Sequence, residues 1–111
     1  GNISKTTTTS MTEVTLDKLK LDFGSFMYSE IQERSFVLTN RGETPLIIQD
    51  IITSCGCMKV RYDKSPVPPG GKLEITVIYK AEKAEYFNKT ITVYCNIVSS
   101  PIMLKIEGSA E

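Results

Sequence analysis

Histidine and tryptophan are both absent from this sequence. Without histidine, the chain has no imidazole to act as the base of a Ser-His-Asp or Cys-His catalytic site. The same absence removes the usual imidazole metal ligand and the side chain that most often carries protons near neutral pH. We therefore expect a protein that is not an enzyme, with no catalytic residues and no cofactor.

Net charge and long apolar runs are missing as well. The 13 basic residues equal the 13 acidic residues, so no overall field draws the protein to nucleic acid or to an anionic membrane surface. No stretch approaches the roughly 20 apolar residues of a membrane-spanning helix. We expect a single folded domain, since 111 residues are too few for two, and we expect it neither to bind nucleic acid nor to span a membrane.

The first residues are polar and rich in threonine, and they show no apolar rhythm. This composition predicts a flexible polar tether at residues 1–13 and one domain at residues 14–111. A polar leader fits an exported protein whose lipid anchor or signal peptide has been removed. A ragged chain end is the alternative.

From residue 14 onward, short apolar segments of period two are separated by turn residues. They predict strands at 14–16, 19–23, 35–40, 46–52, 59–62, 72–80, 87–96 and 101–107. We expect Gly24 to end the second strand and residues 80–85 to form a hairpin connection. The segment 46–52 is apolar on both faces, which predicts a central strand. Seven or eight such strands are typical of an all-β antiparallel sandwich.

Cys95 is in phase with Ile91 and Val93, so we expect it in the core as a small apolar residue. The alternative is a disulfide from Cys95 to Cys55 or Cys57, similar to the inter-sheet bridge of antibody domains. Those domains pack a buried tryptophan against that bridge, and this chain has none.

The candidate site is the cluster Cys55, Gly56, Cys57 and Met58, at the end of the apolar run. Two extended residue steps span about 7 Å between Cα atoms, at the limit for a disulfide, so a bridge needs the bend that Gly56 permits. We consider three roles. The favoured one is structural, as a shaped turn or local bridge. The others are a thiol redox pair and a Cu(I) site of Cys55, Cys57 and Met58, because soft sulfur ligands suit that ion.

A combined motif extends from about Leu19 to Gly108. Its members are Phe36 to Asn40, Gly42, Pro45, Leu46, Ile48, Ser54 to Cys57, Pro69, Gly70, Ile75, Val77, Tyr79, Phe87, Lys89, Ile91, Val93, Asn96, Leu104, Ile106 and Gly108. On these residues the chain resembles a bacterial Ig-like domain family of unknown function, common in Bacteroides-type bacteria and marked by Cys-Gly-Cys. That family is similar to the major-sperm-protein-like and Hydin-type modules. The chain departs from it at Met58, where threonine is usual, and at Glu85-Tyr86, near a usual glycine.

The resemblance implies an immunoglobulin-like β-sandwich and an exported, periplasmic or cell-envelope lipoprotein, and it supplies no established activity. We expect a non-catalytic module that mediates interaction with a protein or a glycan, or that spaces another domain. The competing hypothesis is a thiol redox or Cu(I)-binding protein that acts through Cys55 and Cys57.

Overall fold

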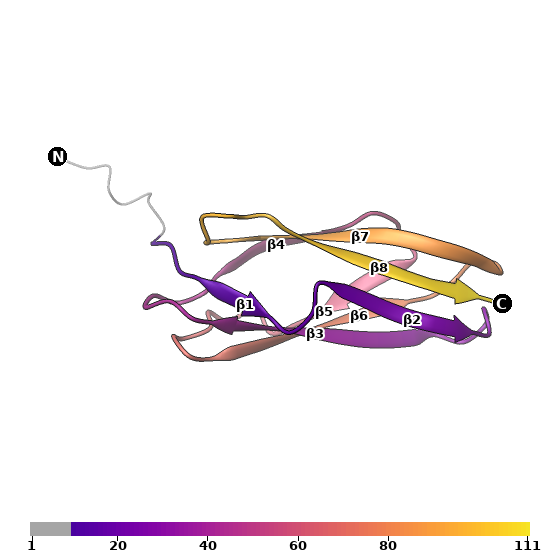
Figure 1. Cartoon of the computed structure of the whole chain (residues 1–111), viewed down its shortest axis with the longest axis horizontal. Coiled ribbons are helices and arrows are strands. Elements are labelled where there is room, and N and C mark those ends of the chain that lie inside the picture. Colours follow the sequence, from indigo (N-terminus) through magenta and orange to yellow (C-terminus); the bar gives the residue numbers. More distant parts are fainter. Residues whose placement is uncertain (1–9) are drawn as a thin grey trace.

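The computed structural model describes residues 10–111, which form eight strands in two facing sheets (Figure 1). The first sheet has the order β1 (Val14–Leu16), β3 (Gln32–Asn40), β6 (Lys72–Tyr79), β5 (Met58–Arg61). The second has the order β2 (Lys20–Phe26), β8 (Ile102–Ala110), β7 (Glu85–Cys95), β4 (Ile48–Thr53). The predicted Ig-like β-sandwich is confirmed, but not as a wholly antiparallel one, because β2 pairs with β8 in parallel and the second sheet is mixed. Within the described part, no helix is long and apolar enough to cross a membrane.

The core lies between the sheets and follows the predicted alternation. The inward positions of β6 are Leu73, Ile75, Val77 and Tyr79, and each is at most 5% exposed. Ile91, Val93 and Cys95 fill the matching positions of β7. The prediction for Cys95 is confirmed, because it is a buried free thiol whose pKa is raised by burial.

The prediction of a central strand at 46–52 is wrong, because β4 is an edge strand. It pairs with β7 alone, and the chain then crosses to β5 in the first sheet. Ile48 and Ile51 pack against the core, whereas Ile52 is 49% exposed on the outer face of the second sheet. Apolar residues on both faces of a strand therefore do not require neighbours on both of its edges.

The prediction that Gly24 ends the second strand is wrong, because Gly24 lies inside β2. Its φ of 66° lies in the left-handed region, which glycine adopts without a steric penalty. The pairing of β2 with β8 shifts register between Asp22 and Ser25, and the Asp22 carboxylate accepts a hydrogen bond from the Gly24 N–H. Gly24 thus marks a β-bulge, after which the strand continues to Phe26.

Residues 80–85 do not form the predicted hairpin connection. They join β6 of the first sheet to β7 of the second, so the chain crosses the sandwich here. Lys80 remains close to the first sheet, since its N–H donates to the carbonyl of Cys57 at 2.9 Å. This crossing lies beside the candidate cysteine turn.

The predicted tether at 1–13 falls in part outside the described residues, which begin at Ser10. Residues 10–13 contact the sandwich, where Thr12 is only 4% exposed. The buried Asn96 side chain donates to the carbonyls of Ser10 and Pro45 and accepts from the Ile47 N–H. The fold therefore includes residues ahead of position 14, while the tether at residues 1–9 stays a prediction.

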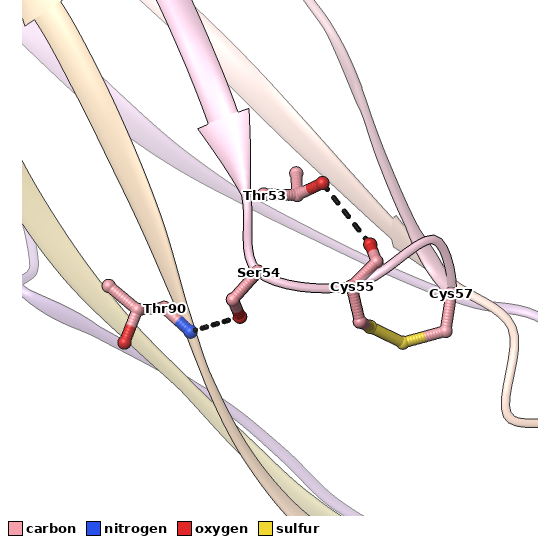
Figure 2. The surroundings of a disulfide bond; sticks show 5 residues. All are labelled: Thr53, Ser54, Cys55, Cys57 and Thr90. Atoms are coloured by element: carbon pink, nitrogen blue, oxygen red, sulfur yellow. Dashed lines mark hydrogen bonds between the residues drawn. A yellow bond between two sulfur atoms is a disulfide. The ribbon is translucent and has the colours of Figure 1, made fainter.

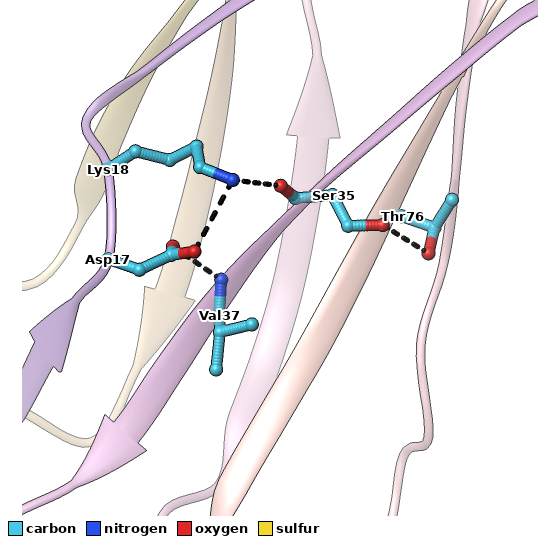
Figure 3. A network of polar contacts seen from close by, with 5 residues as sticks. All are labelled: Asp17, Lys18, Ser35, Val37 and Thr76. Atoms are coloured by element: carbon cyan, nitrogen blue, oxygen red, sulfur yellow. Dashed lines mark hydrogen bonds and ion pairs between the residues drawn. The ribbon is translucent and has the colours of Figure 1, made fainter.

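A polar network holds the passage from β1 to β2 against β3 (Figure 3). The Asp17 carboxylate accepts the Val37 N–H at 2.7 Å, and Lys18 Nζ lies 3.4 Å from the same carboxylate and donates to the Ser35 carbonyl. These contacts hold the pKa of Asp17 below its usual range, with the Val37 N–H as the main cause. The network fixes where the chain leaves the first sheet for the second.

Candidate functional site

The candidate site is a covalently closed turn between β4 and β5. Cys55 and Cys57 form a disulfide, with their Cα atoms 5.3 Å apart (Figure 2). A bend at Gly56 therefore brings the two cysteines closer than an extended chain would. The structural hypothesis of a local bridge agrees with this geometry, and the alternative pairing with Cys95 does not, because Cys95 is free.

Hydrogen bonds tie this turn to its neighbours (Figure 2). The Ser54 hydroxyl accepts the Thr90 N–H at 3.0 Å, and the Ser54 N–H donates to the Thr90 carbonyl. The Thr53 hydroxyl donates to the Cys55 carbonyl at 3.2 Å. Both cysteines are half-buried and pack against the core. The turn is thus held by β7 on one side and by the core beneath it.

Met58 does not lie with the two cysteines at the surface. Its side chain is 3% exposed and belongs to the core, as the first residue of β5. The sulfurs of Cys55 and Cys57 are bonded to each other, so in this state they are not thiolates for a metal. Residues 10–111 contain no cluster of three or more His, Cys, Asp or Glu side chains that could hold a metal ion. The Cu(I) hypothesis therefore concerns the reduced chain and stays a prediction.

A groove of about 680 Å³ lies beside the disulfide turn. Its lining comes from Ile31, Gly56, Cys57, Lys59, Ile78, Lys80, Ala81 and Glu82. Because Val77 and Tyr79 point into the core, Ile78 and Lys80 lie on the outer face of the first sheet.

Sequence reasoning identified the cysteine turn but missed the rest of the groove. Ile31 is 57% exposed just before β3, and Ile78 is a half-buried apolar residue at an outward position of β6. The register of β3 and β5 on β6 brings Glu33 and Lys59 to either side of Ile78. The one available signal was Ile78 itself, which interrupts the polar side of an otherwise alternating strand.

Comparison with known sequences gives one family. The model of the family described as "Protein of unknown function (DUF1573)" matches residues 14–110. No protein of curated function matches the chain at a significant level. That Cys-Gly-Cys is typical of the family stays a prediction.

Several solved structures share the fold. A protein of unknown function from Porphyromonas gingivalis W83 is 21% identical, with a TM-score of 0.77 over 96% of this chain, and the chain spans only 50% of that protein. The ASH/PapD-like domain 7 of human CEP192 is 10% identical, with a TM-score of 0.77, 100% of this chain covered and 94% of that one. SSP-19, an MSP-domain-like protein of Caenorhabditis elegans, is 14% identical, with a TM-score of 0.62 and coverage of 86% and 97%. These likenesses concern the fold alone.

Proposed function

Since the chain belongs to the DUF1573 family, we propose that it is a non-catalytic Ig-like module of the bacterial cell envelope. We further propose that it binds a protein partner through the groove beside Cys55 and Cys57. Of the expected roles, protein interaction is favoured over spacing, because spacing needs no groove. It is favoured over glycan binding, because sugar hydroxyls on the aliphatic surface of the groove would lose hydrogen bonds to water without replacement.

The proposal rests on apolar side chains that remain exposed in the groove, one wall of which is held by the Cys55–Cys57 disulfide. Ile31 is 57% exposed and Ile78 is half-buried, and both line the groove with Cys57. Burial of exposed apolar surface by a partner releases water, which favours binding at such a groove. The disulfide limits the motion of one wall, which lowers the entropy lost when a partner binds.

The disulfide also supports the envelope location. Disulfides persist in oxidising compartments, such as the bacterial periplasm and the cell surface, and are rare in the cytosol. The fold likeness to a protein of Porphyromonas gingivalis bears on the proposed bacterial source and not on the location. Attachment by a lipid anchor stays a prediction that no described residue tests.

Site-specific photo-crosslinking in the source bacterium tests the proposal. A photoreactive side chain at Ile31 reports on the groove, and the same side chain at Met103, 63% exposed on the second sheet, is the matched control. We expect a discrete protein adduct from position 31 and none from position 103. Ile78→Arg in the same chain is expected to lower the adduct yield on the order of tenfold, since filling the groove removes a central contact.

The absence of any adduct from position 31 would remove the groove as the binding surface. The same adducts from positions 31 and 103, or a yield that Ile78→Arg leaves unchanged, would show contact without a specific site.

A second candidate function is thiol exchange at Cys55 and Cys57. It is favoured by their half-exposed position, with Cys57 lining the groove where a dithiol of another protein could approach. Such a dithiol would break the S–S bond, leave two thiols on this chain and become a disulfide itself. Cu(I) binding would follow only after that step, since it needs the freed thiolates.

A further inference from the structure

We propose that the groove selects an extended peptide in which an acidic side chain and an aliphatic side chain stand two residues apart. This inference rests on the proposed function and adds the chemistry of the partner. It follows from the charged side chains at the groove, from the spacing of side chains along β6 and from the apolar side chains that form the floor of the groove.

The charges come from two lysines that lack acidic partners. Lys59 and Lys80 are exposed, and neither forms an ion pair within residues 10–111. By contrast, the nearby Arg61 is neutralised by Glu33 at 3.0 Å. The two ammonium groups outnumber the Glu82 carboxylate of the same lining, so the groove carries net positive charge, which complements a carboxylate on a partner.

The spacing comes from the outer face of β6. Ile78 and Lys80 are two residues apart and point to the same side, while Lys59 lies opposite Ile78 in the register with β5. Same-side positions on any extended chain repeat at about 6–7 Å. A peptide lying along β6 can therefore place a carboxylate at Lys80 and an aliphatic side chain on Ile78 when the two are separated by one residue.

The floor of the groove favours a peptide over a glycan. Ile31 and Ile78 offer aliphatic surface, and Cys57 and the buried Ala81 also line the groove. Aliphatic peptide side chains gain free energy when they bury such surface. Sugar hydroxyls placed there would lose hydrogen bonds to water without replacement.

Glu82 also lines the groove, and its negative charge allows a test in which the expected change in affinity has the opposite direction. Its carboxylate is exposed and repels an acidic peptide. Removing this charge by Glu82→Gln should therefore raise affinity for an acidic peptide, whereas removing the charge of Lys59 or Lys80 should lower it.

The test uses a fluorescent peptide, Glu-Thr-Val-Thr-Glu, whose symmetric pattern fits either chain direction, with Lys-Thr-Val-Thr-Lys as the charge-reversed control. Fluorescence anisotropy on the full oxidised chain at low salt should show saturable binding of the acidic peptide only. Lys59→Gln with Lys80→Gln should weaken it about five- to tenfold, consistent with two exposed ion pairs. Lys105→Gln, on the outer face of the second sheet, should change it by less than about twofold.

The inference is overturned by the absence of saturable binding, by equal binding of the two peptides, or by binding that the double lysine variant leaves unchanged. Binding of an acidic oligogalacturonide in place of the peptide would overturn it as well, in favour of an anionic glycan. If photo-crosslinking from position 31 succeeds while the acidic peptide fails, the groove is the interface but its partner has other chemistry. If both fail, the proposed function fails with the inference.

Discussion

Asn40→Ala is expected to lower the free energy of unfolding by about 4 kcal/mol. Asn40 is fully buried, and its amide uses both ends. The oxygen accepts from the Thr12 hydroxyl at 2.6 Å and from the Gly42 N–H at 3.1 Å. The NH₂ group donates to the Thr44 carbonyl at 2.8 Å and the Val67 carbonyl at 2.9 Å. Alanine leaves all four partners without this amide, while the Thr12 backbone keeps its hydrogen bond to the Asn96 carbonyl.

Urea unfolding followed by circular dichroism measures this effect. Asn88→Ala is the matched control, because Asn88 is exposed on β7, and its expected change is below about 0.5 kcal/mol. A loss for Asn40→Ala no larger than that of the control would mean that the buried amide does not organise this end of the sandwich.

Gly108→Ala is expected to lower the free energy of unfolding by about 2–3 kcal/mol, which corresponds to about 10–15 °C in the melting temperature. A Cβ at position 108 would lie 2.7 Å from Phe87 Cζ and 2.9 Å from Phe23 Cβ. Phe87 cannot move aside freely, because its ring stacks on Tyr79 with 4.0 Å between centroids. The added methyl therefore displaces a packed aromatic cluster rather than one side chain.

Gly56→Ala is the control for this substitution. A Cβ there meets no atom within 4 Å apart from its two chain neighbours, and Gly56 does not have a left-handed φ, so the melting temperature should change by less than about 3 °C. Equal melting temperatures of the two alanine variants, measured by calorimetry, would contradict the close packing of β8 against Phe87 and Phe23.

The sequence predicted the sandwich because each inner strand buries one face. In β6 and β7, alternate residues such as Ile75 and Val93 had to be apolar, and period two is visible without knowledge of partners. The order of the strands within each sheet has no comparable signal in the sequence. The apolar run that became β4 favoured a central strand, yet its position depends on where the chain crosses to β5 after Thr53, which is a property of the whole topology.

The candidate site was predictable only in part, for the same reason. Cys55, Gly56 and Cys57 are neighbours in sequence, so their bend could be inferred from spacing alone. Ile31, Ile78 and Lys59 meet only through the register of three strands. Met58 is buried because β5 begins directly after the turn, with its first side chain in the core. So short a strand does not show from the sequence alone which of its side chains face the core.

The proposed function requires that the Cys55–Cys57 disulfide holds one wall of the binding groove and is not repeatedly reduced and re-formed. Acid quenching of source cells, alkylation of free thiols under denaturing conditions, then reduction and a second alkylating label, followed by peptide mass spectrometry, tests it directly. We predict the first label on Cys95 alone and the second on Cys55 and Cys57, since Cys95 is the free thiol of the described residues. A substantial fraction of Cys55 and Cys57 with the first label would contradict the account and favour the thiol or Cu(I) function.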